Sequence, residues 1–142
     1  MVLSFYLDTN VLVSFFTADN LSERAEIFLS ANRGPFALSD LAAVEFSAVI
    51  ARQVRIRDRP RTEATAVLTE FDAWCELSTN RVAMASEHLA LADQYLRRLD
   101  LALMAPDAIH IAIARWAGST LVTFDQQMAA AARTVGVAVA EA

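Results

Sequence analysis

The chain opens with MVLSFYLDTN (residues 1–10), in which an almost wholly apolar run rich in β-forming residues ends at Asp8. A short apolar run that stops at a polar turn is typical of a strand buried on both faces of a parallel sheet. In open α/β sheets, ligands bind beyond the carboxyl ends of such strands. The opening stretch therefore predicts a strand over residues 2–7 and places Asp8 at the expected site.

Length and composition limit the class of protein. The 142 residues are most simply one domain, residues 1–142, with enough chain to bury a sizeable core. No apolar run reaches the roughly 18 residues of a membrane span, and no basic segment precedes an apolar one as in a secretory signal. The lone Cys75 excludes an internal disulfide. We therefore expect a cytoplasmic protein without membrane contact, whose 56% hydrophobic content indicates a protein partner or self-association.

Charge is distributed unevenly along the chain. The net charge of −5 at pH 7 argues against a generally basic nucleic-acid binder. The 12 basic residues are all arginine, and five of them fall within ten positions: Arg52, Arg55, Arg57, Arg59 and Arg61. This basic segment is either a solvated helix end and loop or a surface that contacts phosphate groups.

Helical and strand patterns alternate after the opening stretch. Helices are predicted over residues 10–16, 21–31, 41–52, 60–71, 84–98, 106–117 and 126–134. Further strands are predicted over residues 36–38, 74–77, 119–123 and 136–139. This alternation indicates an α/β fold with a mainly parallel sheet.

The helix that contains Glu45 is predicted to bury Leu41, Val44, Ala48 and Ala51, which recur at helical spacing. Glu45 lies beside this face, one turn from the helix start. An acid in that position, in a helix that follows a parallel strand, points toward the carboxyl edge of the sheet. The alternative is an acid that only stabilises the helix N-terminus.

Four acids are predicted to meet at this edge of the sheet. Asp8 and Asp125 each end a strand, Asp107 lies in the first turn of a helix, and Glu45 lies one turn inside another. Carboxylates held close together repel one another, and a divalent cation relieves that repulsion. An all-oxygen site suits Mg²⁺ or Mn²⁺, whereas the single cysteine and two widely separated histidines give zinc little support.

Carboxylates with divalent cations at a sheet edge are suited to phosphoryl chemistry. The chain contains neither a nucleophile-elbow serine motif nor a phosphate-binding P-loop motif. Receiver domains and haloacid-dehalogenase-like phosphatases also carry aspartates at strand ends, but both use a lysine, and this chain has none.

Four motifs follow one another in the chain: LDTNVL at 7–12, Ser39 followed by Glu45, PDAIHIA at 106–112 and LVTFD at 121–125. In order and spacing they resemble the PIN-domain ribonucleases, and most closely the VapC-type toxins of bacterial toxin–antitoxin pairs. The resemblance covers essentially the whole chain. It implies a Rossmann-like, three-layer α/β/α fold around a mainly parallel sheet of about five strands.

The resemblance also implies a function, that of an endoribonuclease dependent on Mg²⁺ or Mn²⁺. Such an enzyme hydrolyses RNA phosphodiester bonds by in-line attack of water and leaves 5′-phosphate and 3′-hydroxyl ends. The implied metal-binding catalytic acids are Asp8, Glu45, Asp107 and Asp125. Asn10 and Thr123 would support them by positioning carboxylates or water.

One departure from the family pattern concerns the number of metal ions. Some relatives carry a further acid shortly after the last aspartate, where this chain has Gln126 and Gln127. Occupancy of a second metal position therefore stays open. We interpret His110 as a structural or supporting residue, with direct catalysis as the alternative, because the carboxylate scheme needs no imidazole base.

The resemblance further implies a cognate antitoxin that occupies the acidic cleft, and a homodimer. The candidate RNA contacts are Arg52, Arg55, Arg57 and Arg59. The competing hypothesis is a PIN-like fold without turnover that serves as an RNA- or protein-binding module.

Overall fold

The computed structural model describes residues 4–142, which form four strands and seven helices. In chain order the elements are β1 (Phe5–Leu7), α1 (Thr9–Phe16), α2 (Ser22–Ala31), β2 (Phe36–Ser39), α3 (Asp40–Arg55), α4 (Arg61–Ser78), β3 (Thr79–Val82), α5 (Ser86–Arg97), α6 (Ala105–Ala117), β4 (Thr120–Val122) and α7 (Gln126–Thr134). No helix in this part of the chain is long and apolar enough to cross a membrane.

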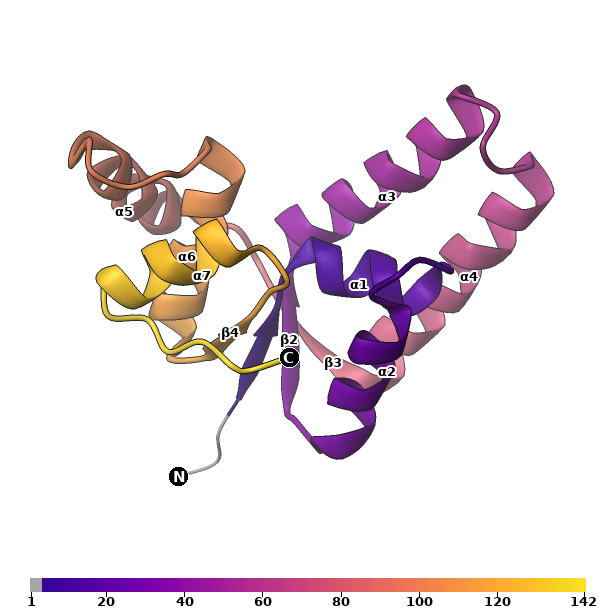
Figure 1. Cartoon of the computed structure of the whole chain (residues 1–142), viewed down its shortest axis with the longest axis horizontal. Coiled ribbons are helices and arrows are strands. Elements are labelled where there is room, and N and C mark those ends of the chain that lie inside the picture. The colour runs from indigo at the N-terminus through magenta and orange to yellow at the C-terminus, as the bar shows by residue number, and fades with distance from the viewer. Residues whose placement is uncertain (1–3) are drawn as a thin grey trace.

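The strands form one sheet in the order β3-β2-β1-β4, and every pair is parallel. Phe5 of β1 pairs with Phe36 of β2 on one side and with Thr120 of β4 on the other. Helices α1–α4 lie on one side of the sheet and α5–α7 on the other (Figure 1). The predicted three-layer α/β/α architecture with a parallel sheet is confirmed.

Alternation along β1 separates two hydrophobic cores. Phe5 and Leu7 pack with α1–α4, whereas Tyr6 packs with α5–α7. All three side chains are buried, as expected for a central strand covered on both faces. Because side chains alternate from face to face, Asp8 continues on the side of Tyr6, toward α6.

Two details of the sheet differ from the sequence-based expectation. The strand expected at 74–77 is part of α4, because Phe71 and Cys75, four residues apart, both pack into the core and keep the helical period. The third strand in chain order is instead β3, which directly follows α4. The expected fifth strand at 136–139 is reduced to one parallel bridge between Leu121 and Val139, so the sheet has four strands within residues 4–142. Positions 2 and 3 of the predicted first strand lie outside the described residues.

The buried face of α3 also differs from the expectation. Ala42, Phe46 and Ile50 are buried, whereas Val44 is 68% exposed. Phe46 stacks on Phe71 of α4, with ring centroids 3.9 Å apart and an interplanar angle of 11°. The apolar stripe through Val44 also recurs at helical spacing but contains no aromatic side chain, so the aromatic face is the one that packs inward.

Substitutions at neighbouring positions test this orientation of α3. Phe46→Ala should lower the free energy of unfolding by about 3–5 kcal/mol, because it empties a buried, stacked position. Val44→Ala should change it by no more than about 0.5 kcal/mol. Urea unfolding followed by circular dichroism measures both values. Equal losses of stability in the two variants would contradict the assigned face.

Candidate active site

Two of the four predicted acids follow a strand and cap the next helix. Asp8 directly follows β1 and caps α1, where its Oδ1 accepts the Thr9 N–H at 2.7 Å. Asp125 follows β4 and caps α7, where its Oδ1 accepts the Met128 N–H at 3.1 Å. Exposed N–H groups at a helix start favour a carboxylate. The local fold therefore fixes two of the acids at the carboxyl edge of adjacent parallel strands.

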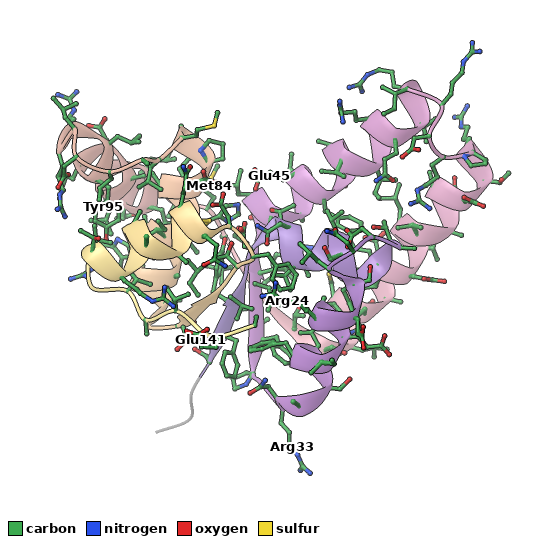
Figure 2. The ribbon with its side chains drawn as sticks, in the orientation of Figure 1. Arg24, Arg33, Glu45, Met84, Tyr95 and Glu141 are labelled. Carbon is green, nitrogen blue, oxygen red and sulfur yellow. The ribbon has the colours of Figure 1, made fainter. Side chains whose placement is uncertain are left out.

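The other two acids lie on helices that flank this edge. Asp107 lies in the first turn of α6, and Glu45 lies in the second turn of α3, near the sheet (Figure 2). The four acids line one cleft of about 440 Å³. Asp19, in the loop after α1, is a fifth acid in this lining and was not singled out from the sequence. The composition of residues 17–20 predicts a turn but does not indicate that Asp19 lines the cleft.

Asp8 is the most buried of the acids, at 5% exposure. Burial raises its pKa, and the interaction with His110, the hydroxyl of Thr123 and the N–H of Thr9 oppose that shift. The Thr123 Oγ1–H donates to Asp8 Oδ2 at 2.8 Å. Each carboxylate oxygen thus accepts one short hydrogen bond, which orients the group at the floor of the cleft.

Thr123 and Asn10 connect the ends of β1 and β4. Thr123 Oγ1 accepts the side-chain amide of Asn10 at 3.2 Å and the N–H of Asp125 at 3.1 Å. Asn10 in turn accepts the N–H of Phe124 at 3.2 Å. These bonds fix the spacing between Asp8 and Asp125, as expected of residues that position carboxylates.

The acids interact electrostatically across the cleft. Partial burial raises the pKa of Asp107, and the charges of Asp8 and Asp125 raise it further. Neighbouring carboxylates thus add to the effect of burial, as expected of like charges held close together. Within residues 4–142, no three acidic, histidine or cysteine side chains converge closely enough to enclose a metal ion by themselves. A hydrated Mg²⁺ needs no such cage, since it keeps several waters and binds one or two carboxylates, so this donor set fits it.

Glu45 is held by Thr9 and by His110, the histidine interpreted from the sequence as structural or supporting. Its Oε1 accepts the Thr9 hydroxyl at 2.9 Å and contacts His110 Nε2. Partial burial acts to raise the pKa of Glu45, but the hydrogen bonds with His110 and Thr9 outweigh it and lower the pKa. His110 Nδ1 lies 2.6 Å from the Tyr6 hydroxyl. The spacing of Tyr6, two residues before Asp8, was the available signal that both face α6.

The arginine segment lies away from the acids, at the end of the α3–α4 hairpin that is farthest from the sheet (Figure 1). Arg52 and Arg55 are exposed in the last turns of α3, and Arg57 follows with a φ of 60°. Arg59 donates to Gln53 at 2.7 Å and lies 3.7 Å from Glu63. Arg52 lies seven residues after Glu45, about 10 Å along the same face of the helix.

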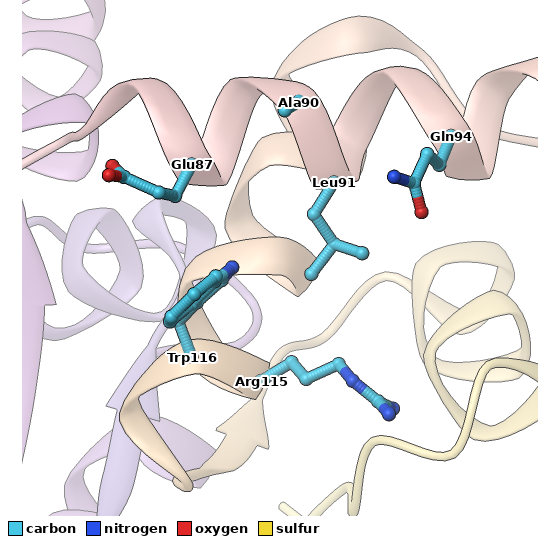
Figure 3. A pocket seen from close by; sticks show the side chains of 6 residues that line it. All are labelled: Glu87, Ala90, Leu91, Gln94, Arg115 and Trp116. Carbon is cyan, nitrogen blue, oxygen red and sulfur yellow. The ribbon is translucent and has the colours of Figure 1, made fainter.

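A second hollow, of about 500 Å³, lies between α5 and α6 (Figure 3). Leu91 and Gln94 line it from α5, and Arg115 and Trp116 line it from α6. Its one acid, among the described residues, is Glu87. This hollow lacks grouped carboxylates, so the acidic cleft is the stronger candidate for chemistry.

The chain is similar to one protein family over most of its length. The family model described as PIN domain matches residues 5–134. No curated protein sequence matches the chain.

Several solved structures share the fold. VapC20 of Mycobacterium tuberculosis, described as a sarcin-ricin loop cleaving toxin, has a TM-score of 0.75 at 17% identity, covering 98% of this chain and 100% of that one. FitAcB of Neisseria gonorrhoeae has a TM-score of 0.73 at 20% identity, covering 96% of each chain. DNA-bound VapBC of Salmonella typhimurium has a TM-score of 0.73 at 15% identity, covering 98% of each chain.

The raised pKa of Asp107 makes a prediction about stability and pH. In the folded state this carboxyl holds its proton above the ordinary value of 3.8, so the metal-free protein loses stability as pH rises past that value. Asp107→Asn removes that loss. Thermal melts in EDTA should show the variant melting above the wild type at pH 7, with a difference that shrinks toward pH 4.

Asp93→Asn is the matched control, because Asp93 is exposed on α5 and pairs with Arg97 at 2.8 Å. The difference in melting temperature between this variant and the wild type should not shrink from pH 7 toward pH 4 in the same way. An Asp107→Asn difference that is constant with pH would refute the raised pKa of Asp107.

Proposed function

Because the chain belongs to the PIN domain family, we propose that it is a metal-dependent endoribonuclease that acts as the VapC-type toxin of a toxin–antitoxin pair. The observation that carries the proposal is the cleft in which acids from four separate elements meet. The charges of Asp8 and Asp125 add to burial in raising the pKa of Asp107, which supports a cation as the missing partner. The solved structures of similar fold include toxins and toxin–antitoxin complexes.

The residues that would hold Mg²⁺ or Mn²⁺ are Asp8, Glu45, Asp107 and Asp125. When bound, such a cation lowers the pKa of a water molecule and offsets charge on a phosphodiester. Thr123 and Asn10 hold Asp8 and Asp125 at fixed spacing through the hydrogen bonds between the strand ends. Thr9 holds Glu45 at the opposite wall of the cleft.

The proposed substrate is RNA, although the protein carries a net charge of −5. Binding of an anion then depends on the cations in the cleft and on local arginines along the α3–α4 hairpin. Arg52 and Arg55 are the best placed, because they are exposed at the end of α3. Arg59 contributes less, because Gln53 and Glu63 already engage its guanidinium.

The proposed partners are a cognate antitoxin and a second copy of the chain. Large apolar side chains are exposed on several helices and loops, among them Val44 at 68%, Met104 at 74% and Trp116 at 60%. Such surfaces favour protein contacts. An antitoxin arginine that reaches the carboxylates would supply the charge that the cleft lacks and so inhibit the enzyme.

Substitution of single carboxylates tests the activity. With Mg²⁺ or Mn²⁺, the wild type should cut total or transfer RNA at a few fixed positions and leave 5′-phosphate ends, whereas EDTA should abolish cutting. Asp8→Asn and Asp107→Asn should each reduce the rate at least about 100-fold, since a metal supplies several kcal/mol of charge stabilisation. Sequencing of the product ends locates the cuts, and Asp93→Asn should retain the wild-type rate.

The same experiment separates the competing hypothesis of a binding module. Cuts that persist in Asp107→Asn would contradict the proposed role of the carboxylates in cleavage. A wild type that cuts no RNA, yet binds RNA or a protein partner as tightly as Asp107→Asn does, would favour binding without turnover.

The arginine segment makes a separate prediction about RNA affinity. In the Asp107→Asn background, which keeps the RNA intact, Arg52→Ala with Arg55→Ala should weaken binding. The slope of log K against log salt should fall by about 0.7 for each phosphate group that the variant no longer binds. Fluorescence anisotropy over a salt series measures both quantities. Arg97→Ala on α5 is the control, and an equal effect there would exclude a specific role for the hairpin.

A further inference from the structure

A chain of buried polar groups runs beneath the acidic cleft and ends on Glu45. The Tyr6 hydroxyl lies 2.7 Å from Ser39 Oγ and 2.6 Å from His110 Nδ1. Ser39 also accepts the Ala42 N–H at 3.1 Å, at the start of α3. His110 Nε2 contacts Glu45 Oε1, one turn farther along α3. The groups therefore connect β1, β2, α3 and α6 behind one wall of the cleft.

The direction of each hydrogen bond follows from the donors available. An ionised Glu45 can only accept, so His110 Nε2 carries a proton and donates it. In a neutral imidazole the other nitrogen is then an acceptor, so the Tyr6 O–H donates to Nδ1. The Tyr6 oxygen accepts in turn from the Ser39 hydroxyl, which itself accepts from the backbone of Ala42. Every donor is used once along this path.

We propose that Tyr6 and Ser39 are positioning residues that hold His110 as the Nε2–H tautomer, so that the imidazole orients Glu45 for the metal ion; this inference rests on the proposed function. The hydrogen bonds that Glu45 accepts from Thr9 and His110 both fall on Oε1. That arrangement leaves Oε2 without a hydrogen bond from either residue and available as a metal ligand. The tautomer of a histidine is set in this way by the partner of its other nitrogen.

Packing alone does not account for the polar side chains of this hydrogen-bonded series. Tyr6 and Ser39 are 0% exposed and His110 is 1% exposed. Tyr6 packs among apolar residues of α6 and α7, a position that phenylalanine could fill. Burial of three polar side chains is costly unless all are satisfied, and here each finds a partner that leads to the acid at the cleft.

Tyr6→Phe is the direct test, because it removes the donor to His110 and keeps the ring. Mn²⁺ affinity, measured by isothermal titration calorimetry on the otherwise unaltered protein, should weaken about 10-fold, as is typical when the partner of a ligand-orienting group is removed. Tyr95→Phe is the matched control: Tyr95 lies in the same core, and its buried hydroxyl has no hydrogen-bond partner among residues 4–142. That variant should bind Mn²⁺ as the wild type does.

Nitrogen-15 NMR of the imidazoles gives a second readout that needs neither metal nor activity. In the metal-free wild type, His110 should show a protonated Nε2 and an unprotonated Nδ1, and Tyr6→Phe should mix the two tautomers. His88 serves as the internal reference, because its Nδ1 accepts the Ala85 N–H at 2.9 Å and is independent of Tyr6. Unchanged His110 signals together with unchanged Mn²⁺ affinity in Tyr6→Phe would overturn the inference.

A pair of His110 variants decides the matter if Tyr6→Phe does not fold. The amide nitrogen of His110→Gln can take the place of Nε2 and should keep Mn²⁺ affinity near the wild-type value. His110→Asn is too short to reach Glu45 and should lose affinity about 10-fold or more. Equal affinity in the two variants would refute orientation through Nε2. A wild type that binds no Mn²⁺ would overturn the proposed function instead, while the NMR spectra would still judge the hydrogen-bond chain.

Discussion

A buried carboxylate needs hydrogen-bond donors, and the burial of Asp8 is the constraint on which the rest of this structure depends. Asp8 is 5% exposed at the end of the central strand. One donor is the N–H of Thr9, supplied by the start of α1, and the other is the hydroxyl of Thr123 from the end of β4. The second bond requires β4 to lie beside β1, as it does in the sheet. The order of the strands and the satisfaction of one charge are therefore linked.

The same strand serves both cores and the cleft because of its two-residue period. Phe5 and Leu7 face the layer of α1–α4, and Tyr6 faces the layer of α5–α7. Asp8 follows Tyr6 on that second side, which explains why His110 of α6 lies 3.7 Å from Asp8 Oδ1. Two polar groups of the site, Tyr6 and Asp8, thus lie along one face of a single short strand. A shift of one residue in its register would turn both toward the opposite core.

Much of the fold could be predicted from strand ends and helix starts. The parallel α/β layers and the positions of Asp8 and Asp125 after strands follow from local patterns in the chain. The buried face of α3 could not be predicted, because apolar residues recur at helical spacing both on the Val44 face and on the Phe46 face, and only the ring of Phe71 in another helix distinguishes them. The prediction of a strand at 74–77 was wrong for a similar reason: the apolar, aromatic composition suits both states, and burial against other helices decides between them. The supporting residues of the site were harder still to predict. Tyr6, Ser39 and His110 are separated by 33 or more positions, and only the tertiary fold joins their hydrogen bonds into one path to Glu45.

Electrostatics separates the roles of the cleft and the arginine segment in the proposed reaction. Arg52 is about 10 Å from Glu45 along α3, and Arg55 is about 15 Å away. The Debye length at physiological ionic strength is about 8 Å, so these exposed charges are largely screened from the acids. They cannot neutralise the cleft, and the acids do not engage them as salt-bridge partners. In the proposed reaction, binding of a phosphate at the acids would therefore depend on bound cations, and the arginines would contact phosphates farther along the same RNA strand.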